Sequence, residues 1–160
     1  MTDMLVKLYN LPDRLPAFPK LQAQDVRLRK PLASEKSLVV NWVQEYFGQV
    51  WADEMDVSFS RLPVSAFVAQ QGRTLVGFAC YDASALGYFG PTGVLESFRG
   101  NGIGRALLFA CLLEMRTKGY GYAIIGWIGP QEFYEKSVGA TIIPDSTPGI
   151  WKDFLYEIDE

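Results

Sequence analysis

The residues whose types and spacing most clearly indicate a binding site are three glycines and an arginine. They lie between an extended apolar run and a long apolar helix. Residues 99–104 read Arg-Gly-Asn-Gly-Ile-Gly and follow the apolar run at 88–95. Glycines let backbone N–H groups point outward together, and a helix beginning near Ile103 adds unpaired N-terminal donors and the positive end of its dipole. The segment therefore predicts a site for an anionic group such as a phosphate.

Two common phosphate-binding patterns do not fit this segment. The dinucleotide fingerprint G-x-G-x-x-G fails because the third glycine falls at Gly104 and position 105 is arginine. The P-loop pattern fails because no lysine followed by serine or threonine closes the loop. Neither a Rossmann site nor a P-loop is expected here.

The absence of histidine from the sequence removes several catalytic mechanisms. Serine-histidine and cysteine-histidine triads are excluded, as are the common metal sites that contain histidine. Cys80 and Cys111 lie in apolar segments without C-x-x-C spacing, so neither a disulfide framework nor a zinc site is expected, and no metal is predicted. Any general base must be a carboxylate, tyrosine, cysteine, lysine or relayed water.

Length and composition indicate one ordinary globular domain. The chain has 160 residues, 49% of them hydrophobic and 21% charged, which suits a single packed core. Its net charge of −3 and the lack of a dense basic run argue against a nucleic-acid partner. No apolar run approaches a membrane span and no signal-like segment opens the sequence, so we expect no membrane partner and a cytoplasmic location.

Hydrophobic spacing predicts the elements that must position the glycine turn. Residues 1–25, with three scattered prolines, predict an extended arm, and residues 26–160 predict a single domain. Apolar residues recur at helical spacing from Ser34, a possible N-cap, to Trp51, with a weak point at Gly48. The acidic residues that follow predict a short helix or a loop.

The rest of the chain predicts a mixed α/β fold with helices on both faces of one sheet. Apolar runs separated by turn residues indicate most of its elements. Strands are expected at 26–29, 65–70, 74–81, 88–95, 122–128, 141–143 and 151–158, and helices at 103–118 and 131–137.

The glycine segment resembles the R/Q-x-x-G-x-G/A pyrophosphate loop of the GCN5-related N-acetyltransferases (GNAT family). Further along, residues 133–140 read Phe-Tyr-Glu-Lys-Ser-Val-Gly-Ala, similar to the F-Y-x-K-x-G-F signature of the same family. Two motifs in the right order are stronger than one, and the resemblance extends over residues 65–140. It implies a GNAT-type acyl-CoA N-acyltransferase fold, a mostly antiparallel mixed sheet of about six or seven strands with about four helices.

The resemblance also implies where acetyl-CoA would bind. Val94 and Leu95 would pair with the pantetheine arm through their backbone, and that backbone would polarise the thioester carbonyl. An asparagine that usually contacts this arm is absent, since residues 127–130 read Trp-Ile-Gly-Pro. The residues expected at the phosphates of the cofactor are Arg99, Gly100, Asn101, Gly102, Ile103, Gly104, Arg105 and Lys136.

Tyr134 occupies the tyrosine position of the family and would donate a proton to the departing thiolate. The base that takes the proton of the acceptor amine is open among Glu54, Glu96 and a water relay. Each of these residues also has a structural alternative: Tyr134 as a core tyrosine, Glu54 as part of a solvated helix end, and Lys136 as an exposed lysine. Trp51, Phe89 and Trp127 are expected in the core or in a pocket wall.

The function predicted from the resemblance is transfer of an acetyl group from acetyl-CoA to the primary amine of a small molecule, by direct attack. The alternative is an acyl-CoA-binding sensor or scaffold that catalyses nothing, and a nucleotide-binding fold of another kind is a third possibility. A homodimer is compatible with the proline-containing arm and the exposed edges of the predicted sheet.

Overall fold

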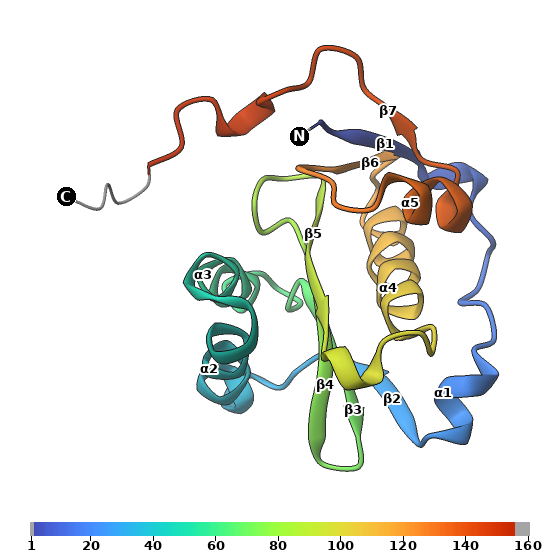
Figure 1. Cartoon of the computed structure of the whole chain (residues 1–160), viewed down its shortest axis with the longest axis vertical. Helices are drawn as coiled ribbons and strands as arrows, with labels where there is room; N and C mark the ends of the chain where they lie inside the picture. The colour runs from blue at the N-terminus through green and yellow to red at the C-terminus, as the bar shows by residue number, and fades with distance from the viewer. Residues whose placement is uncertain (1, 156–160) are drawn as a thin grey trace.

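The computed structural model describes residues 2–155, which fold into a seven-stranded sheet with helices on both faces (Figure 1). The strand order is β2-β3-β4-β5-β6-β1-β7, and neighbours run antiparallel except the parallel pair β5 and β6. The strands are β1 (Met4–Lys7), β2 (Val26–Arg29), β3 (Ala66–Gln71), β4 (Thr74–Tyr81), β5 (Tyr88–Val94), β6 (Tyr122–Ile125) and β7 (Thr141–Ile142). The mixed, mostly antiparallel sheet expected from the sequence is confirmed.

Five α-helices cover the sheet within the described residues. They are α1 (Pro19–Ala23), α2 (Lys36–Phe47), α3 (Gln49–Ser58), α4 (Ile103–Thr117) and α5 (Gln131–Val138). The helices α2 and α3 lie on one face and α4 lies on the other (Figure 1). Each face has its own apolar core, with Val43 and Met55 against the sheet on the first and Leu107 and Leu112 on the second. No helix in residues 2–155 is both long enough and apolar enough to cross a membrane.

The prediction of an extended arm at residues 1–25 is wrong for its first part. Met4–Lys7 forms β1, which lies between β6 and β7 and pairs with both. Met4, Val6 and Leu8 are fully buried. The alternation of buried and exposed residues that identifies a strand is only four residues long here, too short to stand out among the scattered prolines that follow.

The predicted helix from Ser34 to Trp51 is two helices. Gly48 separates α2 from α3 with φ +97°, a conformation that favours glycine. Ser34 is not the N-cap, because it lies in the 3-10 turn η2 (Ala33–Glu35). The acidic residues after the break continue as α3, which brings Trp51 against Phe78 in the sheet, with 6.2 Å between ring centroids.

The C-terminal segment also differs from expectation. The strand β6 ends at Ile125, before the predicted Ile128. Instead of a strand from residue 151, the chain forms the 3-10 turn η4 (Gly149–Trp151) and then irregular structure to residue 155. Residues 156–158 of the predicted strand lie outside the described residues.

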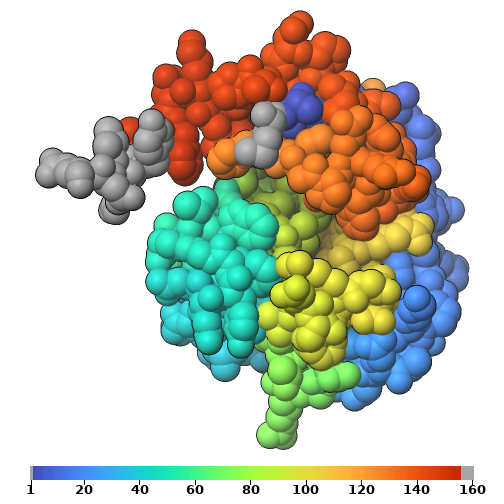
Figure 2. Space-filling view, viewed as in Figure 1, coloured from blue at the N-terminus to red at the C-terminus, as the bar shows by residue number. Residues whose placement is uncertain are grey.

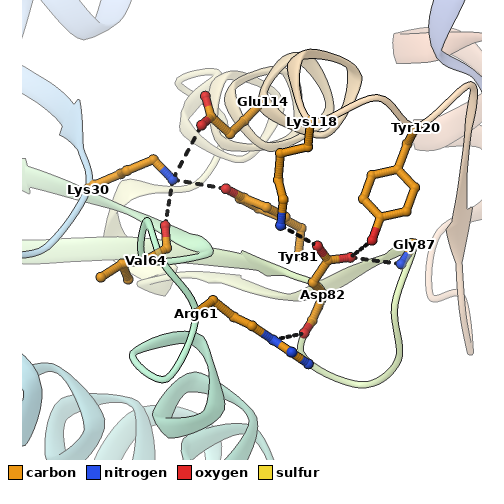
Figure 3. A network of polar contacts seen from close by, with 9 residues as sticks. All are labelled: Lys30, Arg61, Val64, Tyr81, Asp82, Gly87, Glu114, Lys118 and Tyr120. Carbon is orange, nitrogen blue, oxygen red and sulfur yellow. Dashed lines mark hydrogen bonds and ion pairs between the residues drawn. The ribbon is translucent and has the colours of Figure 1, made fainter.

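A buried polar network fixes the turn that leads into β5 (Figure 3). The carboxylate of Asp82, which is fully buried, accepts hydrogen bonds from Lys118 Nζ and Tyr120 Oη at 2.9 Å and from the Gly87 N–H at 2.8 Å. Burial by itself would raise the pKa of Asp82, but these three donors outweigh it, and the pKa lies below its ordinary value. The network joins the end of β4 to the end of α4 and so sets where β5 begins.

Candidate functional site

A cleft of about 840 Å³ opens where β5 and β6 separate. The two strands pair through Tyr88 with Ile124 and through Phe89 with Ile125. Beyond these pairs, residues 90–94 and 126–130 diverge and line the cleft, together with residues 98–100 and 102–105. Figure 2 shows the hollow between α2 and α3 on one side and the start of α4 with the α5 region on the other. Strands separated in this way expose backbone groups that a ligand can meet.

The predicted anion site forms one end of this cleft. Gly100 and Gly102 have φ values of +81° and +87°, and Gly102 is the N-cap of α4. No side chain caps this helix, so the first N–H groups of α4 are free to bind an anion. Asn101 does not line the cleft; its Nδ2 donates to the carbonyl of Phe98 at 3.1 Å and so stabilises the turn itself.

The backbone at the end of β5 presents one of the two expected N–H groups to the cleft. The Leu95 N–H donates to the Val76 carbonyl of β4 at 2.9 Å, so it is not available to a ligand. Because N–H groups alternate between the two sides of a strand, the Val94 N–H points away from β4, toward the cleft. The Val94 carbonyl accepts a hydrogen bond from Arg99 Nε at 3.2 Å.

The three cationic side chains expected at the phosphates differ in position. Arg99 and Arg105 line the cleft, and the Arg105 guanidinium lies 5.2 Å from the centre of the Phe109 ring. Lys136 does not line the cleft. Its Nζ pairs with Glu132 at 2.6 Å, and both side chains are 75% exposed. The structure therefore fits the alternative of an exposed lysine better than a phosphate ligand.

Tyr134 lies on α5 and lines the cleft although it is only 7% exposed. Its ring meets Phe89 and Phe133 edge to face, with centroid distances of 6.4 and 5.1 Å. Burial raises the pKa of its phenol to about 12, and its hydroxyl makes no hydrogen bond within residues 2–155. The phenol is therefore protonated at neutral pH, with its proton available to a ligand.

Neither predicted carboxylate lines the cleft. Glu54 is half-buried on α3 and accepts a hydrogen bond from Ser84 Oγ. Burial raises its pKa, which the bond from Ser84 partly opposes. Glu96 is exposed at the start of the 3-10 turn η3 (Glu96–Phe98). The structure does not bring Glu54 and Glu96 together with Tyr134.

Aromatic rings form the other end of the cleft. Phe47 from α2 and Trp51 from α3 are stacked, with 5.8 Å between ring centroids, and Trp127 follows β6. Trp151, which sequence reasoning assigned to a strand, stacks on Trp127 with 5.7 Å between centroids. Spacing along the chain carries no signal for this contact, since the two residues lie in separate irregular segments.

The described residues provide neither a metal site nor a reactive cysteine. They contain no group of three or more His, Cys, Asp or Glu side chains that could hold a metal ion. Cys80 and Cys111 are free and buried, and burial raises the pKa of both thiols, that of Cys80 to about 12. A neutral, buried thiol is a poor nucleophile.

A mixed sheet that splits beside a glycine turn and an uncapped helix N-terminus provides an apolar cleft with backbone N–H donors at which an anionic group can bind. The chain belongs to the acetyltransferase (GNAT) family, whose model matches residues 36–140. A comparison with curated proteins finds no match.

Solved structures share the fold at low sequence identity. One is a GCN5-related glucosamine N-acetyltransferase region of a fungal multi-domain GH3 β-N-acetylglucosaminidase, with a TM-score of 0.72, 15% identity, and coverage of 89% of this chain and 19% of that chain. Another is a GCN5-related N-acetyltransferase from Sphaerobacter thermophilus, with a TM-score of 0.64, 18% identity, and coverage of 89% and 48%. This chain therefore spans less than half the length of either. A third, a GNAT family acetyltransferase from Brucella melitensis in complex with acetyl-CoA, has a TM-score of 0.58, 17% identity, and coverage of 75% and 88%.

Proposed function

We propose that this protein is an acetyl-CoA-dependent N-acetyltransferase that acts on the primary amine of a small molecule. The observation that carries the proposal is that a glycine turn with free N–H donors and the protonated Tyr134 phenol line the same cleft. Membership of the GNAT family supports an acyltransferase, and a distant structural neighbour binds acetyl-CoA.

The residues of the cleft fit a coenzyme A diphosphate. Gly100 adopts a positive φ, and a Cβ added there would meet no atom within 4 Å, so the turn is open on its outer side. The N–H groups of Ile103 and Gly104 lie at the uncapped start of α4. Arg99 and Arg105 add positive charge beside them, as an anionic group requires.

When bound, the cofactor would supply an acetyl group activated as a thioester. The Val94 N–H, which points toward the cleft, would donate to the thioester carbonyl oxygen, where negative charge develops as the amine attacks. A C–N bond forms and the C–S bond breaks, and Tyr134 gives its phenolic proton to the departing sulfur. The amine nitrogen gives one proton to relayed water and Tyr134 regains a proton from solvent, so the products are an acetamide and the free thiol.

We do not assign the proton-accepting role to Glu54 or Glu96, because neither lines the cleft. Of the three candidates from the sequence, water relayed to bulk solvent is the one this arrangement favours. The proposal requires no metal, nucleic acid or membrane. A cytoplasmic location and a homodimer stay predictions.

No carboxylate among the described residues lines the cleft, and this favours a second candidate, an acyl-CoA-binding module without catalysis. It would keep the glycine turn and use the cleft for binding alone. The protonated Tyr134 phenol weighs against it, because binding an acyl chain does not need a proton donor there.

Two measurements on the purified protein test these candidates in sequence. Thermal melting with acetyl-CoA at 100 times its dissociation constant should add about 2.7 kcal/mol to the free energy of unfolding. No shift at millimolar acetyl-CoA would overturn both candidates. Free thiol is then measured with a panel of amines. Release above the rate without amine supports the transferase, and binding without release from any amine supports the module.

A further inference from the structure

The aromatic end of the cleft, formed by Phe47, Trp51 and Trp127, presents two indole rings to solvent. Trp51 is 37% exposed and Trp127 is 48% exposed, although both line the cleft. Indole surface left exposed inside a concave site is apolar area available for a ligand. The two residues come from opposite walls, Trp51 from α3 and Trp127 from the segment after β6.

Each indole stacks on a second aromatic ring. Phe47 stacks on Trp51 with 22° between ring planes, and Trp151 stacks on Trp127 with 29° between planes. Trp151 also packs against Gly126, where an added Cβ would lie 2.4 Å from its ring, and meets Tyr88 edge to face. The rings of both walls are therefore held in fixed planes.

The backbone of Trp127 is fixed as well. Its φ of +51° is unusual for a non-glycine residue, and its N–H donates to Asp3 Oδ1 at 3.2 Å. Asp3 is only 5% exposed and belongs to the segment that runs into β1. Its backbone carbonyl accepts a hydrogen bond from the Ile143 N–H at 2.9 Å. Both ends of the described chain thus hold Trp127 in place.

Among the described residues, the cleft lining has cationic side chains but no carboxylate. The only ionisable side chains among the described residues that line the cleft are Arg99, Arg105 and Tyr134. A polyamine would find no carboxylate among these residues to pair with its additional ammonium groups, and burying an unpaired charge is costly. An amino sugar would bring several hydroxyl groups into a lining with few polar side chains, and burying hydroxyls without hydrogen-bond partners is also unfavourable. The lining therefore favours an amine whose remaining body is apolar and uncharged.

We infer that the acceptor is an aralkylamine, a primary amine carried by a flat, uncharged aromatic ring that stacks on Trp127. Trp151 is a positioning residue that acts through Trp127. The inference rests on the proposed function. Removal of the amine from water in this aromatic cleft favours its neutral form, which would allow transfer without a carboxylate among the described lining residues.

The test measures thiol release at saturating acetyl-CoA with four probes: tryptamine, 2-phenylethylamine, spermidine and glucosamine. We expect kcat/KM for the two aromatic amines to exceed that for the other two by about 100-fold or more. Equal or better use of spermidine or glucosamine would overturn the inference and leave the transferase intact. Binding of acetyl-CoA without release from any probe would overturn this inference, and further amines would then decide on the transferase itself.

Substitutions in the indole pair Trp127 and Trp151 test whether these rings bind the acceptor. Trp127→Ala should raise KM for tryptamine about tenfold or more, and Trp151→Phe should raise this KM by a smaller factor. In both variants kcat should change little, and the thermal shift caused by acetyl-CoA should be retained. Tyr122→Ala is the matched control, because Tyr122 is an exposed aromatic residue of β6 that does not line the cleft. If Trp127→Ala leaves KM for tryptamine at the Tyr122→Ala value, Trp127 does not bind the acceptor and the inference fails.

Discussion

The two ends of the cleft are built in different ways. The anion end comes from one continuous segment, residues 94–105, in which Val94, the glycine turn and the start of α4 present backbone groups to the cleft. The aromatic end brings together Trp51, Trp127 and Trp151 from three separate segments and is tied to Asp3 near the start of the chain. One end is a local conformation, and the other is a product of tertiary packing.

This difference determines what each end tolerates. A backbone site depends on the φ values of its glycines, so side-chain changes that keep those values should be mild there. A packed aromatic site depends on the planes and positions of its rings. A change of one methyl group at a residue that packs against these rings should therefore shift them and lower stability. Independent measurement of acetyl-CoA binding and acceptor KM in variants of each end separates their contributions.

Tyr134→Phe should give the largest effect, because the proposed mechanism assigns Tyr134 to the chemical step and to neither binding end. Loss of a positioned general acid costs about 100- to 10,000-fold in rate. We expect kcat to fall within this range, while the thermal shift by acetyl-CoA and the acceptor KM stay near wild type. Single-turnover thiol release with the best amine of the panel measures the change.

The matched control for this variant is Tyr46→Phe, which removes the hydroxyl of a tyrosine that is 52% exposed on α2. Its kcat should equal that of the wild type. A Tyr134→Phe protein with wild-type kcat would remove Tyr134 from the mechanism and return it to the core-tyrosine alternative.

Gly100→Ala tests the anion end through its backbone. Gly100 and Gly72 both have a positive φ, +81° and +57°, and an added Cβ meets nothing within 4 Å at either. Each alanine should therefore cost about 1 to 2 kcal/mol of stability through backbone strain alone. Gly72 lies in the β3–β4 turn, outside the cleft lining.

Only the variant at Gly100 should also weaken acetyl-CoA binding, by about tenfold, because the strained turn must keep its shape to hold the phosphate groups. Titration calorimetry with both variants gives the comparison. Equal acetyl-CoA affinities in Gly100→Ala and Gly72→Ala would show that the turn does not hold the cofactor.

The same contrast explains how much the sequence could predict. The glycine turn, the β3–β4 hairpin and α4 are local, and their residue spacing located them correctly. Tyr134 was found because it lies beside a recognisable motif, and the structure places it in the cleft. Features encoded within about 15 consecutive residues were accessible because turn chemistry and helical period act over that distance.

The errors concern contacts between distant segments. Residues 4–7 look like part of a loop until β6 and β7 provide partners for them. Trp151 lies in a turn that Asp3 and Gly126 hold in place from elsewhere in the sequence. Whether Glu54 or Glu96 faces the cleft depends on how α3 and η3 dock, which no local pattern reports.

Gly93→Ala tests the aromatic end through its packing. A Cβ at Gly93 would lie 2.5 Å from Cε1 of the Phe47 ring, so Phe47 must move and its stack with Trp51 must change. We expect about a fivefold rise in acceptor KM and about 1 to 3 kcal/mol lower stability from overpacking. Gly129→Ala is the control, since Gly129 also lines the cleft but has open space around it. A Gly93→Ala protein with an unchanged acceptor KM would mean that the Phe47–Trp51 wall does not contact the acceptor.

Glu54→Gln should give the smallest change in rate, below about threefold, because Glu54 lies outside the cleft lining and the proposed proton path does not use it. Its effect should appear in stability. Burial raises the pKa of Glu54 above its ordinary value of 4.5, so between these two values the folded protein binds more protons than the unfolded chain. Stability therefore falls as pH rises through this window, and the charged carboxylate remains a cost above it.

Replacing Glu54 with glutamine removes that titration. The melting temperature of Glu54→Gln should depend less on pH above 4.5 than that of the wild type and should not lie below it at pH 7. Glu96→Gln removes a glutamate charge from an exposed turn outside the cleft lining and is the control for loss of charge. A loss of 100-fold or more in kcat for Glu54→Gln, with the thermal shift by acetyl-CoA preserved, would instead make Glu54 the general base. Deprotonation of the amine would then depend on Glu54 as well as on the aromatic end of the cleft.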